Sequence, residues 1–145
     1  MPAKFQLVID CANPDAQSRF WAAALGYVVE PPPDGFESWN DYWRAAGLDE
    51  DIEGYDSLMD PDAVGPRIWF QPVPEPKTIK NRLHLDIPAS AGRSEPLGQR
   101  RVRVDAKVSE LVALGAKALY VHSQEGLDHY AVTMQDPEGN EFCVN

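Results

Sequence analysis

One arrangement of residues occurs twice along the 145-residue chain. Helical spacing of apolar residues ends at Ala24-Leu25-Gly26 in the first half and at Ala113-Leu114-Gly115 in the second. Each half then carries a turn signal, Met59-Asp60-Pro61 in one and Met134-Gln135-Asp136-Pro137 in the other. The distance from glycine to aspartate is 34 residues (26 to 60) against 21 (115 to 136), and an acidic insertion accounts for the 13 extra residues. We therefore predict two tandem strand–helix–strand–strand–strand modules.

The first half begins with a strand and a helix that has clear end signals. Alternating large apolar residues predict a strand over 4–11. Asn13 can cap the first helical amides, Pro14 fits the first helical position, and Asp15 suits the positive end of the helix dipole. Gly26 is placed to end the helix in a left-handed conformation. We expect further strands over 27–30, 55–59 and 67–73.

The second half follows the same order. We expect an alternating strand over 82–87 and a loop of Gly, Ser and Pro over 88–99. Val104, Val108, Leu111 and Val112 then predict a helix that ends at Leu114-Gly115. The remaining expected strands cover 117–121, 129–134 and 141–145.

The insertion over 31–54 has its own composition. Between positions 34 and 62 the sequence has ten Asp or Glu residues and a single basic residue, Arg44. Trp39, Tyr42 and Trp43 lie among them. The simplest interpretation is a solvated surface insertion that its aromatic residues hold against the domain. The alternatives are a lid over a pocket, since long loops often carry function, and a contact between two copies of the chain.

Composition and charge narrow the class of protein. Hydrophobic residues make up 43% of the chain, enough for one folded domain over 1–145. The net charge of -10 argues against a nucleic-acid partner, because phosphate binding needs the opposite sign. No apolar stretch approaches the ~20 residues that span a bilayer, so we expect no membrane partner. Two cysteines make no disulfide framework, and we expect a cytoplasmic protein.

Three segments resemble a known family. They are FWAAALGY at 20–27, VPEPK at 73–77 with KNRLHLD at 80–86, and DPEGNEFCV at 136–144. Together they make the chain similar to the vicinal oxygen chelate superfamily, which includes glyoxalase I, extradiol dioxygenases and bleomycin-resistance proteins, and more narrowly to its glyoxalase-like domains. The resemblance implies an α+β fold of two βαβββ modules, 4–73 and 80–145, whose half-barrels enclose a ligand cup. It also implies a homodimer.

Strand parity predicts which side chains face that cup. Residues two apart share a face, so His84 and Asp86 oppose Leu83, Leu85 and Ile87. We expect the apolar face to pack on a helix and the polar face to meet the ligand. The expected lining is Gln6, Asp10, Trp69, Gln71, His84, Asp86, Glu141 and Cys143.

The resemblance also predicts where a metal would bind. Metal-using relatives place one ligand on each of four strands, and Gln6 and His84 occupy two of these positions. The two carboxylate positions are filled by Trp69 and Cys143. Glu141 lies two residues before Cys143, about 6.6 Å along the strand, too far to replace a ligand at that position. We therefore expect no cofactor and no tightly bound divalent metal, with Gln6 and His84 as ligands if one is present.

His84 and Asp86 are the candidate catalytic residues. A histidine in a cup can titrate near neutral pH, and the alternative is a structural histidine paired with Gln6 or Asp86. A partly buried Asp86 or Asp10 would serve as a general base, unless Lys77, Lys80 or Arg82 pairs with it. We expect Cys143 to be an inert thiol, Cys11 to face a helix, and no disulfide between them.

Two functions of different classes fit these residues. The first is a glyoxalase-like lyase or isomerase that acts on a small oxygenated carbonyl-type molecule in the cup. The second is metal-free sequestration of a flat cationic antibiotic, which the tryptophans and the acidic charge favour. An interaction module with a filled cup is a third. The sequence does not name the ligand.

Overall fold

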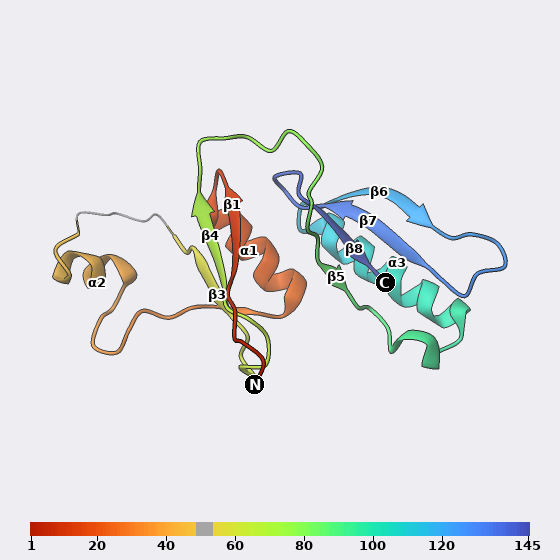
Figure 1. Ribbon diagram of the computed structural model, residues 1–145, viewed down its shortest axis with the longest axis horizontal. Coiled ribbons are helices and arrows are strands. Elements are labelled where there is room, and N and C mark those ends of the chain that lie inside the picture. The colour runs from red at the N-terminus through yellow and green to blue at the C-terminus, as the bar shows by residue number, and fades with distance from the viewer. Residues whose placement is uncertain (49–53) are drawn as a thin grey trace. The chain divides into compact units, whose positions relative to one another are not determined.

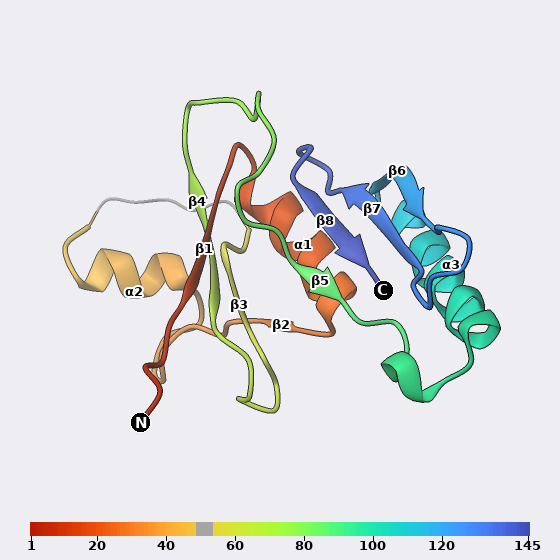
Figure 2. The same ribbon diagram turned by 45° about the vertical axis from the view of Figure 1, so that its right-hand side comes forward.

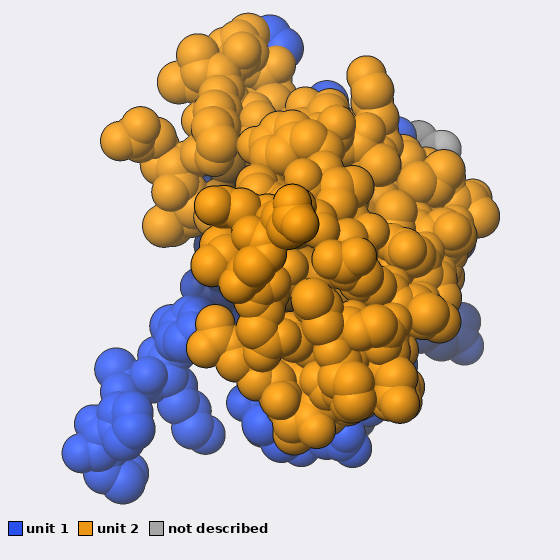
Figure 3. Space-filling model, turned by 90° about the vertical axis from the view of Figure 1, so that its right-hand side faces the viewer, with its two compact units in different colours: residues 1–76 blue, residues 77–145 orange. Residues whose placement is uncertain are grey.

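The structure, a computed structural model, describes residues 1–48 and 54–145 in two compact units, Met1–Pro76 and Lys77–Asn145. Figure 1 gives the order of the elements, and Figure 3 colours the two units. Each unit contains a four-stranded sheet and one long helix, in the order strand, helix, strand, strand, strand. The first unit has one additional short helix between its second and third strands. This is the α+β fold of two βαβββ modules that the internal repeat predicts.

The first unit holds a mixed sheet in the order β1-β4-β3-β2. β1 and β4 run parallel, and the other neighbouring pairs are antiparallel. Its elements are β1 (Leu7–Cys11), α1 (Pro14–Leu25), β2 (Val28–Val29), α2 (Trp39–Ala45), β3 (Ser57–Met59) and β4 (Ile68–Pro72). The parallel pair requires the chain to cross over, and α1 with β2 and β3 makes that connection.

The second unit repeats this topology in the order β5-β8-β7-β6. β5 and β8 are parallel, and the β8–β7 and β7–β6 pairs are antiparallel. Its elements are β5 (Asp86–Ile87), the 3₁₀ turn η1 (Gly92–Ser94), α3 (Leu97–Ala113), β6 (Lys117–His122), β7 (Ala131–Gln135) and β8 (Glu141–Val144). Figure 2 shows α3 running alongside the sheet strands of its own unit.

The ends of α1 follow the sequence signals. The Asn13 side chain accepts a hydrogen bond from the Ala16 amide at 3.0 Å, and Pro14 is the first helical residue. Gly26 ends the helix at φ 71° and donates its amide to the Ala22 carbonyl. A residue with a Cβ would strain this left-handed position. Both predicted helix boundaries are confirmed.

Each unit forms its core between its sheet and its long helix. In β4, Ile68 and Phe70 are buried while Trp69 and Gln71 lie on the other face, and β8 shows the same alternation. The parity predicted for these two strands is therefore confirmed. The apolar core of the first unit contains Cys11, Phe20, Trp21, Ala24, Leu58, Ile68 and Phe70. That of the second contains Ile87, Val104, Leu111, Val132, Met134, Phe142 and Val144.

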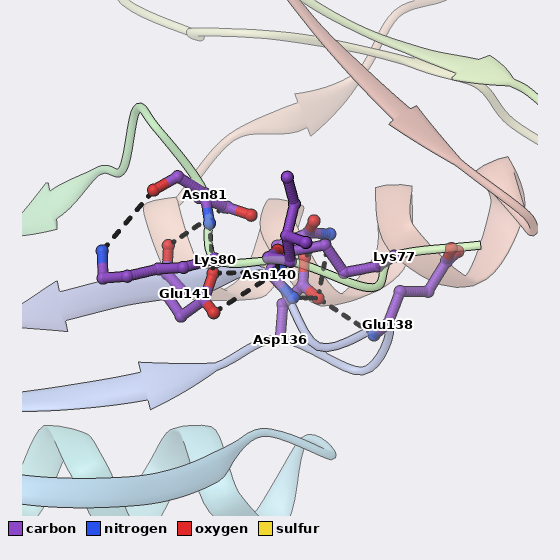
Figure 4. Close-up of polar contacts among 8 residues, drawn as sticks. Lys77, Lys80, Asn81, Asp136, Glu138, Asn140 and Glu141 are labelled. Carbon is purple, nitrogen blue, oxygen red and sulfur yellow. Dashed lines mark hydrogen bonds and ion pairs between the residues drawn. The ribbon is translucent and has the colours of Figure 1, made fainter. Parts of the chain in front are cut away.

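The two Asp-Pro turns have the same internal bonding. The Asp60 carboxylate accepts hydrogen bonds from the amides of Asp62, Val64 and Gly65. The Asp136 carboxylate accepts from the amides of Glu138 and Asn140 and from the Asn140 side chain (Figure 4). The duplication therefore extends to the bonding of individual carboxylates. The hydrogen bond from the Gly65 amide also lowers the pKa of Asp60, because it stabilises the ionised carboxylate.

Several expected element bounds are wrong. The strand expected over 82–87 is only Asp86–Ile87, because β5 has a single partner and pairs with it only opposite Cys143 and Val144. Leu83 is 85% exposed, so it does not pack on a helix as parity suggested. Phe5 precedes β1 and is also exposed. The loop expected over 88–99 ends early, since Pro96, whose φ is -56°, starts α3 at Leu97.

The insertion folds in part around its aromatic residues. Ser38 caps α2 by accepting from the Asp41 amide at 3.1 Å, and Trp39 donates to the Glu30 carbonyl at 3.0 Å. Trp39 and Trp43 stack with ring centroids 5.9 Å apart. The part of the insertion over 49–53 lies outside the described residues. A role as lid or as contact between copies stays a prediction.

No helix among the described residues has the length and apolar character needed to cross a bilayer.

Candidate functional site

The open face of the second sheet carries a hollow of about 210 Å³. β8 supplies its floor, and β6, β7 and the segment before β5 supply its sides. We call it the sheet hollow. Its lining residues are Lys80, His84, Tyr120, His122, Thr133, Glu141, Phe142 and Cys143. Three predicted residues, His84, Glu141 and Cys143, therefore lie together, and each comes from the polar face of its segment.

His84 and Asp86 form a pair beside the sheet hollow. The His84 Nε2 lies 3.4 Å from the Asp86 Oδ1, and the two side chains are 43% and 57% exposed. Asp86 pairs in register with Cys143 across the parallel β5–β8 ladder. Among the described residues the ion-pair partner of Asp86 is His84 and not Lys77, Lys80 or Arg82, and this is the Asp86 pairing that the structural alternative for His84 predicts. A carboxylate next to an imidazole can orient the ring and set its tautomer.

A chain of polar contacts crosses the floor of the sheet hollow. The His122 Nε2 and the Thr133 Oγ1 are 2.8 Å apart, and the Thr133 Oγ1 and the Cys143 Sγ are 3.4 Å apart. The Tyr120 ring meets the His122 ring edge-on, with centroids 5.0 Å apart. A ligand in the hollow would therefore meet an imidazole, a hydroxyl and a thiol on neighbouring strands.

His122 and Thr133 are not among the lining residues predicted from the sequence. The strand expected over 117–121 ends one residue before His122. β6 extends to His122, and its register against β7 shifts between Ala118 and Tyr120. That irregularity breaks simple parity along the strand. The alternation of Thr133 between Val132 and Met134 could have indicated it.

Glu141 is fixed by contacts with the segment that precedes β5 (Figure 4). Its carboxylate accepts a hydrogen bond from the Asn81 amide at 2.9 Å and lies 3.1 Å from the Lys77 Nζ. Burial alone would raise the pKa of Glu141, but the hydrogen bonds from the Asn81 amide and from Lys77 outweigh it and lower that pKa. Glu141 is therefore an ionised structural group.

Four predicted lining residues lie in the first unit. Gln6 accepts a hydrogen bond from the Arg67 Nη1 at 2.8 Å, and Trp69 donates to the Asp56 carboxylate at 3.2 Å. Asp10 pairs in register with Gln71 on the parallel β1–β4 ladder, so the two share a face of the first sheet. Their part in a ligand site stays a prediction.

The glyoxalase-like domain family model matches residues 6–145, nearly the whole chain. The chain belongs to this family. The match covers both βαβββ modules, and no curated protein sequence matches this glyoxalase-like domain.

Solved structures of glyoxalase/bleomycin resistance/dioxygenase proteins share the fold of this domain. An enzyme of that superfamily from Burkholderia phytofirmans has 17% identity and a TM-score of 0.59, with 97% of this chain and 94% of that one covered. The fosfomycin resistance protein FosX from Listeria monocytogenes has 8% identity and a TM-score of 0.61, with 99% and 92% covered. A glyoxalase/bleomycin resistance protein from Albidiferax ferrireducens has 15% identity and a TM-score of 0.53, with 97% and 95% covered. These likenesses show the fold.

The sheet hollow offers three donor atoms to a metal. A nitrogen of His84, an oxygen of Asp86 and the sulfur of Cys143 lie within 4.8 Å of one another. A mixed nitrogen, oxygen and sulfur set fits zinc better than magnesium or calcium, which prefer oxygen ligands. In a tetrahedral zinc site the ligand atoms lie about 3.5 Å apart, so the wider pairs in this group would have to close. The donor chemistry therefore fits zinc, with Asp86 and Cys143 in place of Gln6 beside His84.

Proposed function

We propose that this glyoxalase-like domain binds a small oxygen-rich molecule in the sheet hollow and that His84 moves a proton on it. The observation that carries this proposal is the His84–Asp86 pair, 3.4 Å apart beside a hollow of about 210 Å³ whose other polar groups converge from three strands. A volume of this size suits a ligand of a few heavy atoms. The reaction class that we propose is that of a lyase or isomerase on a carbonyl-type substrate.

Each polar group has a part in this scheme. His84 takes or gives the proton, and Asp86 orients its ring as a positioning residue. The His122 imidazole and the Thr133 hydroxyl are hydrogen-bonded to each other, so the proton that this pair has left over is the one donated to a ligand oxygen. Lys80 lines the same hollow and supplies a positive charge for an oxygen that becomes anionic during the reaction. Glu141 is excluded as the base, because Lys77 and the Asn81 amide already bind its carboxylate.

We further propose that the hollow works without a resident metal. The proposal is supported by Trp69 at one of the two expected carboxylate positions and by the spread of the His84, Asp86 and Cys143 donor atoms, up to 4.8 Å, which is wider than a zinc site needs. A zinc ion held by His84, Asp86 and Cys143 would supply Lewis-acid chemistry to a ligand oxygen. Metal analysis of the purified protein should give well under one zinc per chain. One tightly bound zinc per chain, lost in Cys143→Ala, would contradict this proposal.

A turnover assay tests the catalytic proposal. The protein is incubated with hemithioacetals of α-keto aldehydes and with related carbonyl compounds, with and without added divalent ions. His84→Gln should lower the rate by about 10²–10⁴-fold, the usual contribution of a general acid or base. Arg82→Gln is the matched control, since Arg82 is exposed two residues before His84 and does not line the sheet hollow. Equal rates for the wild type and His84→Gln would contradict the role of His84.

A second candidate function is metal-free sequestration of an antibiotic. One observation favours it: Trp39 and Trp43 stack in an insertion rich in acidic residues, a setting that attracts flat cations. A bleomycin-like cation should then quench tryptophan fluorescence with an affinity that falls as salt rises. Trp43→Leu should weaken that quenching, and Trp21→Leu, at a buried core position, is the control. Absence of quenching at micromolar ligand would remove this candidate.

We also propose that the domain forms a homodimer. The edge strand β6 is exposed along its whole length, including the apolar residues Leu119 and Val121. Unpaired strand edges with apolar side chains are surfaces that other chains cover. Sedimentation at micromolar concentration should give twice the mass of the chain, and a monomer at high concentration would contradict the proposal.

A further inference from the structure

A second, larger hollow lies in the same unit at the other end of the β5–β8 pair. Its volume is about 490 Å³, and it shares no lining residue with the sheet hollow. We call it the loop hollow. Its walls come from the segment after β5, the first turns of α3 and the segment before β7. The residues that matter for its chemistry are Arg93, Arg100, Asp128 and His129.

Arg100 is a buried cation with donors to spare. It is only 7% exposed, although arginine is rarely buried without a full set of partners. Its Nε donates to the Glu95 carbonyl at 3.0 Å, and its Nη2 donates to the Asp128 carboxylate. Within the described residues no acceptor meets its Nη1, although a guanidinium carries five N–H groups. Arg100 therefore presents unused donors to the loop hollow.

Two further groups add positive charge or donors to the same hollow. Arg93 and His129 are both exposed and line it, and neither has a hydrogen bond or ion pair in the described part of the chain. Asp128 is the one acidic side chain in the lining. Among the side chains that line the loop hollow, two arginine charges therefore stand against one carboxylate.

The acidic character of the chain does not extend to this unit. Residues 1–76 contain 14 acidic and 4 basic residues, whereas residues 77–145 contain nine of each. The whole net charge of -10 therefore belongs to the first unit. Within the second unit, an anion in the loop hollow therefore meets no net negative charge.

Asp128 shows which chemistry Arg100 accepts. The Asp128 side chain is 58% exposed on the segment between β6 and β7, so its carboxylate can move away from Arg100 without disturbing the core. Planar guanidinium groups bind carboxylate and phosphate oxygens with the same fork of donors. An incoming anion that also meets Arg93 would make more charge-assisted hydrogen bonds than Asp128 does alone.

We propose that the loop hollow binds a small molecule through an oxyanion, a carboxylate or a phosphate. Arg100 and Arg93 donate to that group, and the Asp128 carboxylate occupies its place when no ligand is bound. The site is separate from the sheet hollow and does not depend on the function proposed there.

Titration with the simplest oxyanions tests this site. Inorganic phosphate and acetate are titrated separately into the ¹⁵N-labelled full chain at constant ionic strength, with chloride as the balancing ion. Amide signals of Gly92 and Tyr130 and the Nε–H signal of Arg100 should shift in a saturable way, while those of Thr133 and Cys143 in the sheet hollow should not. Tighter phosphate binding would identify a phosphate-bearing ligand, and tighter acetate binding a carboxylate.

Three variants separate the site from general charge effects. Arg93→Gln should weaken anion binding about tenfold, the usual effect of losing one charge-assisted hydrogen bond. Asp128→Asn should strengthen it, because the competing carboxylate is gone. Arg82→Gln removes an exposed arginine that lines neither hollow and should leave the affinity unchanged.

The proposal is overturned if neither anion shifts these signals at 20 mM. It is also overturned if Arg93→Gln and Arg82→Gln weaken binding equally, since the effect would then be general electrostatics. If Asp128→Asn fails to fold because Arg100 loses its partner, the comparison of the two arginine variants at exposed positions still decides the matter.

Discussion

The carboxylate of Glu141 accepts a hydrogen bond at 2.9 Å from the backbone amide of Asn81, 60 residues earlier in the chain. This contact fixes the segment that carries Lys80 and His84 against the first residue of β8. Glu141, which is expected from the sequence to line a ligand cup, thus fixes the position of a segment that lines the sheet hollow. Residues 82–85 are expected from the sequence to continue a strand, but β5 begins only at Asp86, and the contact with Glu141 holds the segment just before them.

Glu141→Gln should make stability less dependent on pH. The pKa of Glu141 is lower in the folded protein than its usual value of 4.5, so its ionised form favours folding. That contribution is present above pH 4.5 and is lost as the pH falls through the lower folded pKa. At pH 7 the variant should lose about 1–2 kcal/mol of unfolding free energy, and the difference should shrink at pH 3.

Urea denaturation at the two pH values measures this effect. Glu110→Gln is the control, because Glu110 forms only an exposed pair with Lys107 and should matter by less than about 0.5 kcal/mol. A penalty for Glu141→Gln that is the same at pH 3 and pH 7 would show that its charge is not involved.

Asp136→Ala should destabilise the second unit strongly. Asp136 is buried, and its carboxylate satisfies the amides of Glu138 and Asn140 and the Asn140 side chain. Losing these acceptors leaves donors without partners, at a cost of about 2–4 kcal/mol. Thermal unfolding measures the loss, with the exposed Asp62→Ala as the control. A change no larger than that of Asp62→Ala would contradict the role assigned to this turn.

Thr133→Val should change the hydrogen bonding of the His122 ring without changing the fold. The variant keeps the shape of the side chain but removes the hydroxyl that lies 2.8 Å from the His122 Nε2. We expect the ring nitrogen signals of His122 to shift in long-range ¹H–¹⁵N spectra, since the hydrogen bond helps to set the tautomer. The ring signals of His129 should stay in place. Unchanged His122 signals would mean that the contact is not formed in solution.

Gly65→Ala should lower the stability of the protein, whereas Gly98→Ala should not. A Cβ at Gly65 would lie 2.0 Å from the Tyr27 hydroxyl, so that ring must move, and we expect a loss of about 1–3 kcal/mol. A Cβ at Gly98 meets nothing within 4 Å at the start of α3, where alanine is the better helix former. Stability should be unchanged or slightly raised there. Chemical denaturation of both variants gives the comparison, and equal losses would contradict the packing around Tyr27.

The sequence predicts the fold well because the decisive signals are local. The cap at Asn13, the stop at Gly26 and the alternation around Phe70 each act within a few residues, and all three appear in the structure. The duplicated Asp-Pro turns are also local, and they allow the two modules to be matched.

The candidate site is less predictable because it depends on contacts between distant residues. His122 reaches the sheet hollow through an irregular β6 register, which no alternation of residue types signals. Asn81 binds Glu141, 60 residues later in the chain, and no local pattern of residues signals a contact over that separation. The two arginines of the loop hollow cannot be predicted from the net charge of -10, because the acidic residues of the first unit account for that charge.

A crystal of the protein soaked with a small carbonyl compound tests the central proposal most directly. Density for the compound should lie in the sheet hollow, with a ligand oxygen within hydrogen-bond distance of the His84 ring and of His122 or Thr133. The same soak of the His84→Gln variant should show weaker density or none. A compound that binds elsewhere, or that occupies the hollow equally in both proteins without touching residue 84, would contradict the account.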